Sequence, residues 1–135
     1  MNEMTYDYFM NFLSKEGSDS DYELHKFLNE MVNKEKVIAF YPKGLFKNEN
    51  NLEVYLFLKD KLSIYRLNEA RISLEIINYD QIKTVKFDYQ DIYNPASLEI
   101  ILENQSFEFN SHDDTNNRWA PRFIDLLKKI VKTMN

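Results

Sequence analysis

The residues best suited to chemistry stand together at Ser111-His112-Asp113-Asp114, directly before an amphipathic C-terminal segment. A histidine beside two carboxylates could share a divalent cation, but such sites need three or more converging ligands, and no further ligand is evident. A carboxylate before a helix can instead accept hydrogen bonds from the free N–H groups of the first turn. We therefore expect Asp113 or Asp114 to cap the final helix, and we expect no metal site.

Three further carboxylates, Glu99, Glu103 and Glu108, alternate with apolar residues in a predicted hairpin. On a solvated face they have no burial to raise their pKa, as a general acid requires. The only glycines are Gly17 and Gly44, which excludes a P-loop, a dinucleotide fingerprint and a nucleophile elbow. The sequence thus predicts no catalytic residue, no cofactor and a protein that is not an enzyme.

The composition indicates one globular domain. The 135 residues are 44% hydrophobic and 15% aromatic, which is enough apolar surface to offset the conformational entropy of folding. The chain has no cysteine, which fits a reducing compartment, and its first ten residues carry acids where a secretory signal carries lysines. No apolar run reaches the roughly 20 residues of a membrane span, so we expect a cytoplasmic protein without a transmembrane segment.

Charge is concentrated at the amino-terminal end. Residues 1–35 hold eight acidic and three basic side chains, whereas residues 36–135 hold fourteen of each. Sequence-independent nucleic-acid binding needs clustered cations that neutralise phosphates. The absence of a basic stripe therefore argues against DNA or RNA as a partner.

Apolar residues at helical spacing predict two amphipathic helices within residues 1–34, with a break at Gly17. Ser20 and Glu23 match a capping box, so the second helix should begin near Asp21. Seven segments with strand-like patterns follow, and a last helix should span about 116–133, with Pro121 in its first turn. The predicted strands are 36–41, 52–58, 62–67, 71–78, 82–89, 97–103 and 106–110.

Alternation predicts the pairing of two hairpins. In the last hairpin, a turn at Asn104-Gln105 would place Leu102 opposite Phe107 and Ile100 opposite Phe109. In the earlier one, a loop at Lys59-Asp60-Lys61 would pair Leu58 with Leu62, Leu56 with Ile64 and Tyr55 with Tyr65. A second apolar face would then hold Tyr55, Phe57, Tyr65 and Ile77. Either the amino-terminal helices or a second copy of the chain should cover that face.

The strand order, the long loop after the first strand and the terminal helix with Trp119 resemble the pleckstrin-homology-like fold. The segment Ile76–Val85 is similar to an "I-x-Y-x-x-I-x-x-V" stretch of its bacterial members. The whole chain also resembles small uncharacterised proteins of Gram-positive bacteria and their phages. The expected fold is α+β: a seven-stranded antiparallel barrel or sandwich over 35–135 with a C-terminal capping helix, and a helical extension, 1–34, packed on it.

The resemblance implies binding of a phosphoinositide headgroup or a peptide, through loops at the open end or a sheet edge. Lys43 and Lys47 lie in the matching loop, and Arg71 could approach from the next one. The match fails on the second strand, where Glu53 and Tyr55 replace the basic residues that lipid-binding members carry.

We therefore expect a non-enzymatic module that binds another protein. The loop 42–51 is the first candidate, because Leu45 and Phe46 are apolar between turn-forming residues, where a partner could bury them. Phe46 folding back as a plug of the barrel end is the equal alternative for this loop. The alternative function is binding of a small anionic ligand or a lipid headgroup through Lys43, Lys47 and Arg71.

Overall fold

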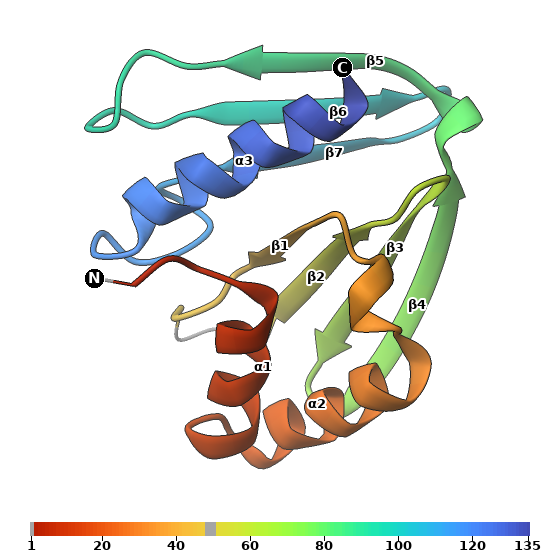
Figure 1. The fold of residues 1–135 in the computed structure, drawn as a ribbon, viewed down its shortest axis with the longest axis vertical. Coiled ribbons are helices and arrows are strands. Elements are labelled where there is room, and N and C mark those ends of the chain that lie inside the picture. Colours follow the sequence, from red (N-terminus) through yellow and green to blue (C-terminus); the bar gives the residue numbers. More distant parts are fainter. Residues whose placement is uncertain (1, 48–50) are drawn as a thin grey trace.

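The computed structural model describes residues 2–47 and 51–135, which form three α-helices and two antiparallel sheets in an open sandwich (Figure 1). The first sheet has the order β1-β2-β3-β4 and the second β5-β6-β7. The predicted α+β class with seven strands is confirmed. The helices are α1 (Tyr6–Lys15), α2 (Asp19–Met31) and α3 (Ala120–Met134), with short 3-10 turns η1 (Lys34–Lys36) and η2 (Tyr79–Gln81). The strands are β1 (Ala39–Lys43), β2 (Asn51–Phe57), β3 (Lys61–Asn68), β4 (Arg71–Asn78), β5 (Ile82–Asp88), β6 (Ser97–Leu102) and β7 (Ser106–Asn110).

The break between the first two helices falls at Gly17, as predicted, but the cap of α2 differs. Ser18 is the N-cap and forms a capping box with Asp21, so the helix begins two residues before the predicted position. The Ser18 hydroxyl accepts from the Asp21 N–H at 3.2 Å, and the Ser18 N–H donates to the Asp21 carboxylate at 3.0 Å. An aspartate can close the box as a glutamate does, and the Ser20–Glu23 prediction was wrong.

The β2–β3 hairpin is one residue out of the predicted register. Phe57 lies opposite Leu62, because the turn holds only two residues, Lys59-Asp60. The Leu58 N–H donates to the Lys61 carbonyl at 2.9 Å and closes this turn. A shift by one residue moves side chains between the faces of a strand, so Tyr65 does not share a face with Tyr55, Phe57 and Ile77 as predicted.

The two faces of the first sheet can be read from ring contacts. Tyr55 points between the sheets, where its ring centroid lies 4.7 Å from that of Phe109 on β7. Tyr65 points the other way, toward Phe27 of α2, at 6.1 Å. Phe57 and Ile77 share the register and side of Tyr55 and belong to the interior of the sandwich. The side facing the helices carries Phe40, Val54, Leu56, Tyr65 and Leu67, all buried.

The amino-terminal helices cover that outer side. Of the residues that we expected a cover to bury, only Tyr65 lies under the helices, whereas Tyr55, Phe57 and Ile77 face the second sheet. α1 and α2 lie against the first sheet in Figure 1, and the ring of Phe9 in α1 lies 5.9 Å from that of Phe40 in β1. Leu24 and Leu28 of α2 are fully buried. The apolar stripes of the helices and the apolar outer face of the sheet therefore bury each other.

The last hairpin is shifted by two residues from the prediction. Its turn is Glu103-Asn104, closed by the Leu102 N–H donating to the Gln105 carbonyl at 2.8 Å. The pairs are Leu98 with Phe109 and Ile100 with Phe107. A shift by two residues preserves the face of every side chain, so the predicted inward set is correct even though its partners are not.

The helix α3 closes one side of the sandwich and packs against β1 (Figure 1). It begins at Ala120, later than predicted, and Pro121 lies in its first turn as expected. Phe123 packs edge-on against Tyr41 with ring centroids 5.2 Å apart, at the centre of the core. Trp119 lies 5.2 Å from the ring of Tyr8, which joins the start of α3 to α1.

Candidate functional site

The loop after β1, the first candidate from the sequence, is tied down by the turn after β7. The Gly44 N–H donates to the Asp114 carbonyl at 2.8 Å, and the Thr115 hydroxyl donates to the Leu45 carbonyl at 2.9 Å. Gly44 has a φ of 97°, and a Cβ there would lie 2.9 Å from the Asn51 carbonyl oxygen. Only glycine fits this position without strain. The start of the loop is therefore an ordered part of the fold.

The two apolar residues of this loop pack into the protein. Leu45 is only 3% exposed. Phe46 is half-buried, with its ring stacked on Trp119 at 5.4 Å and edge-on to Phe12 at 4.9 Å. It adopts a left-handed φ of 69°, which is uncommon for a bulky side chain. These contacts correspond to the plug that we considered as the alternative to a binding role.

The predicted basic residues are only partly brought together. Lys43 and Lys47 line one open groove of about 580 Å³, whose lining does not include Arg71. Lys43 donates to the Glu108 carbonyl and Lys47 to the Asp113 carbonyl. The full lining of the groove is Lys43, Gly44, Lys47, Asn51, Glu53, Arg66, Leu67, Asn68, Asp113 and Asp114. Its three basic side chains thus face three carboxylates.

The predicted capping role of Asp113 and Asp114 is wrong. Asn116 caps the turn before α3, where its side-chain oxygen accepts from the Trp119 N–H at 2.9 Å. The carboxylate Oδ2 of Asp114 instead accepts from the Tyr41 hydroxyl and from the Asn110 N–H, both at 2.7 Å. Asp114 thus joins β1 to the end of β7, and it does so while buried.

Burial dominates the electrostatics of this pair. It raises the pKa of Asp114 above its usual value, although hydrogen bonds from Asn110 and Tyr41 and the charge of Lys43 act in the opposite direction. Burial, together with the Asp114 carboxylate, also raises the pKa of Tyr41 well above its usual value. A raised pKa in a buried group can mark a catalytic acid, but both groups here are engaged in a contact within the fold. Among the residues that the structure describes, no cluster of three or more His, Asp and Glu side chains could hold a metal ion.

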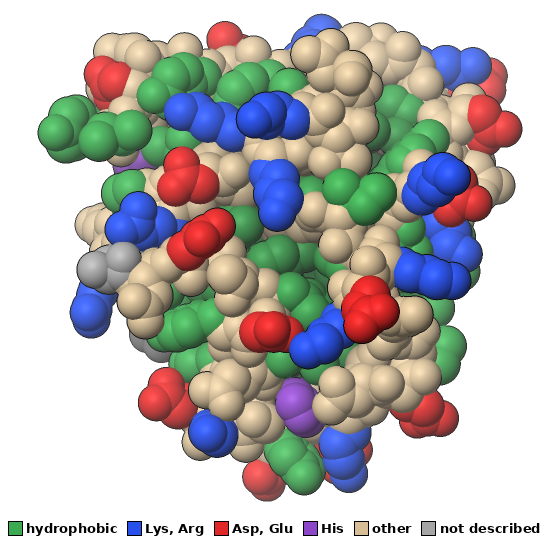
Figure 2. All heavy atoms as spheres, in the orientation of Figure 1, with side chains coloured by type: hydrophobic (Ala, Val, Ile, Leu, Met, Phe, Trp, Pro, Cys, Tyr) green, Lys and Arg blue, Asp and Glu red, His purple; other side chains and the backbone are tan. Residues whose placement is uncertain are grey.

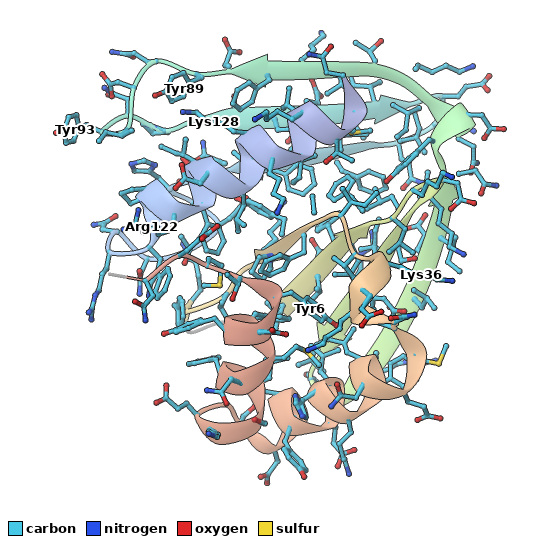
Figure 3. The ribbon with its side chains drawn as sticks, in the orientation of Figure 1. Tyr6, Lys36, Tyr89, Tyr93, Arg122 and Lys128 are labelled. Carbon is cyan, nitrogen blue, oxygen red and sulfur yellow. The ribbon has the colours of Figure 1, made fainter. Side chains whose placement is uncertain are left out.

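A surface that the sequence analysis missed lies on the loop between β5 and β6. Three large apolar side chains point into solvent there: Tyr89 is 44% exposed, Ile92 49% and Tyr93 82%. We call these three residues and Lys128 the tyrosine surface. Figure 3 shows Tyr93 at the tip of the loop and Lys128 of α3 beside Tyr89. A loop with the pattern Tyr-x-x-Ile-Tyr between two strands was the sequence signal that could have identified it.

The tyrosine surface is held in place from both sides. The Asp91 carboxylate accepts from the N–H groups of Tyr93 and Asn94, at 2.9 and 3.0 Å, and these bonds fix the turn that projects Tyr93 outward. The hydrogen bonds, first of all from the Asn94 side chain, lower the pKa of Asp91. The ammonium of Lys128 lies 4.1 Å from the centre of the Tyr89 ring, in cation–π geometry.

Basic side chains continue from this surface along α3. Lys129 and Lys132 follow Lys128, and Arg122 lies in the first turns of the helix (Figure 3). Asp125 is the only acidic residue of α3. In Figure 2, basic side chains lie over this helix next to apolar ones that protrude at the edge of the molecule. The surface thus combines exposed aromatic side chains with positive charge.

The fold and these surfaces define a small α+β sandwich protein with an exposed aromatic and basic surface. The chain belongs to the family described as protein of unknown function (DUF3908), whose model matches residues 3–125. Comparisons with curated proteins and with solved structures found no match. Over the described parts of the chain, no helix has the length and apolar character that crossing a membrane would require.

Proposed function

We propose that this protein is a non-enzymatic module that binds another protein through the tyrosine surface. The observation that carries the proposal is the exposure of Tyr89, Ile92 and Tyr93 on one ordered turn. Tyrosine is typical of the energetic centres of protein interfaces, since it combines a large apolar area with a polar end. A turn that is already fixed loses little conformational entropy on binding.

The architecture supports a binding role. The sheet orders β1-β2-β3-β4 and β5-β6-β7, followed by α3, agree with the pleckstrin-homology-like resemblance, whose members most often bind a partner. We propose membership of that fold group on this agreement. The tyrosine surface belongs to the second sheet and to α3, apart from the loop 42–51 that the sequence favoured.

The charges indicate the chemistry of the partner. Lys128 lies over the Tyr89 ring, and Lys129 and Lys132 follow it along α3, so a complementary surface would carry acidic side chains beside an apolar centre. Acidic side chains around the edge of the partner's surface would increase the association rate, and this effect would weaken as the salt concentration increases. Contacts with Ile92 and Tyr93 would instead determine the lifetime of the complex. We therefore propose an acidic protein partner.

Affinity capture with the tagged full chain tests this function. The double variant Ile92→Ser, Tyr93→Ser should retain the specific partner at least about tenfold less than the unchanged chain, because it removes two exposed apolar contacts. Tyr22→Ser is the matched control, since Tyr22 is a similarly exposed aromatic residue on α2. Equal retention by all three chains would show that the tyrosine surface is not the binding site.

A second experiment tests the alternative function, in which the chain binds an anionic ligand or a lipid headgroup. The groove at Lys43 and Lys47 holds as many carboxylates as basic side chains, so we expect no attraction to phosphate groups. In flotation with vesicles of acidic phospholipid at low salt, the chain should stay unbound. Flotation that Lys43→Ala and Lys47→Ala abolish would instead favour the loop and a lipid headgroup.

A further inference from the structure

Each sheet has two outer strands, and three of these four edges are protected against pairing. An exposed edge is a template for another strand, and proteins block it with proline, bulges, lysines or covering groups. β1 contains Pro42. On β7 the Lys43 ammonium donates to the Glu108 carbonyl and so occupies one backbone acceptor of that strand. β5 has a register shift between Ile82 and Thr84 and carries outward lysines.

The fourth edge, β4, has none of these devices. Its eight residues contain no proline and pair with β3 without a register shift. In the described ranges no group bonds to the free backbone N–H and C=O groups of its residues 71–77, although the Gln105 side chain donates to the Glu75 carboxylate at 3.1 Å. In Figure 1 β4 forms the free rim of the first sheet. It is therefore the strand most open to pairing.

The helix-facing side of β4 is apolar and incompletely covered. Ile72 and Leu74 are half-buried, and Ile76 is 54% exposed. Met31 at the end of α2 is 49% exposed and lies with Leu74 and Ile76 around a groove of about 280 Å³. An added strand would place alternate side chains over this apolar strip.

The opposite side of β4 carries an unbalanced charge. Arg66 bonds to Glu53 and to Glu75, both at 2.9 Å, so one guanidinium serves two carboxylates and the cluster has a net charge of −1. Arg71, at the start of the same strand, forms no ion pair with any described residue. β4 thus carries a positive charge at its start and a net negative charge around Glu75 in its second half, as a self-complementary antiparallel edge requires.

We propose that β4 pairs with β4 of a second copy of this chain, antiparallel and about a twofold axis at Leu74. Leu74 then lies opposite Leu74 of the second copy, and Ile72 lies opposite Ile76. Arg71 reaches Glu75 of the second copy as a diagonal neighbour, within the roughly 7–8 Å that long side chains span. The result is one continuous sheet of eight strands through the dimer.

The side-chain alternation of the strand selects this register. A shift by one residue would bring Leu74 opposite Glu75 and turn the apolar strips of the two copies to different faces. A shift by two residues toward the end of the strand would bring Glu75 opposite Glu75, which repels. A shift by two residues toward its start would leave Ile76 opposite Ala70, outside β4, and so lose an apolar pair. The proposal concerns a different surface from the tyrosine surface and does not depend on the proposed function.

Sedimentation equilibrium of the full chain over a concentration series tests the dimer. The unchanged chain should dimerise, and Ile76→Lys should raise the dissociation constant about 100-fold or more, because each dimer carries the change twice. Ile92→Lys is the matched control, since Ile92 is similarly exposed and lies outside β4. It should leave the dissociation constant unchanged. Far-UV circular dichroism checks that both variants are folded.

Two results would overturn the proposal. One is an unchanged chain that is monomeric at every concentration, and the other is equal weakening by Ile76→Lys and Ile92→Lys. Arg71→Glu provides the charge test: it should weaken the dimer more at low salt than at high salt, because screening removes its interaction with Glu75. An effect of Arg71→Glu that does not vary with salt would overturn the charge pairing and the register with it.

Discussion

The hydroxyl of Tyr41 donates a 2.7 Å hydrogen bond to Oδ2 of Asp114, 73 residues further along the chain. The same oxygen accepts from the Asn110 N–H, so one carboxylate joins β1 to the end of β7. Nearby, the buried Ser111 hydroxyl accepts from the Ala96 N–H at 2.9 Å. The polar cluster that invited a chemical interpretation in the sequence thus closes the edge between the two sheets.

Removing the carboxylate should leave the buried Tyr41 hydroxyl with only a long 3.5 Å contact to the Asn110 carbonyl, and should remove the acceptor of the Asn110 N–H. We predict that Asp114→Ala lowers the free energy of unfolding by about 1–3 kcal/mol, the cost of an unsatisfied buried polar group. Chemical denaturation monitored by the fluorescence of Trp119 measures this change, since Trp119 packs at the start of α3.

A double-mutant cycle isolates the contact. In a Tyr41→Phe background no hydroxyl is left unpaired, so Asp114→Ala should cost less there than in the unchanged chain. Equal costs in both backgrounds would mean that the Tyr41–Asp114 hydrogen bond does not contribute to stability.

The pH dependence of stability should show the raised pKa of Asp114. Because burial raises the pKa of this group above its usual 3.8, the folded state binds the proton more tightly than the unfolded state. The Asp114 contribution is therefore fully present below pH 3.8 and is lost as pH rises through the folded-state pKa.

Asp114→Asn keeps an oxygen that can accept both hydrogen bonds but removes the titration. We expect the stability of the unchanged chain, relative to this variant, to fall as pH rises through that window. Thermal unfolding across an acidic pH series measures the difference. Parallel curves for the two chains would contradict the raised pKa.

The plug formed by the loop after β1 should contribute to stability. Leu45 is buried at the end of the sandwich, so Leu45→Ala should lower the free energy of unfolding by about 2–5 kcal/mol. Lys47→Ala is the control from the same loop and should change stability by less than about 0.5 kcal/mol. Similar small effects of both changes, measured by urea denaturation, would show that Leu45 is not needed to close the sandwich.

Much of the fold could be predicted because period-2 and period-3.6 apolar patterns report burial directly. The seven strands, the break at Gly17 and the first-turn position of Pro121 follow from local residue preferences. The β2–β3 register could not be predicted in this way, because apolar residues on both faces of these strands fit two alignments equally well. A turn of two residues rather than three decided between them.

The residues of the candidate binding surfaces were harder to predict for a related reason. Apolar side chains in a loop look alike in the sequence whether they turn inward or outward. Leu45 is buried and Tyr93 is 82% exposed, although both follow a strand and stand among turn-forming residues. Arg71 was expected near Lys43, but the strand pairing places it at the start of β4, outside the groove of the loop.

The sequence by itself determined the number, order and type of the elements, since these depend on patterns within a few residues. The tertiary structure alone decided which side chains meet across the sandwich, because contacts such as Tyr41 with Asp114 join residues far apart in the chain. It also decided what stays uncovered. The exposure of Tyr93 and the free edge of β4 depend on where neighbouring elements end, and the spacing of residues does not contain that information.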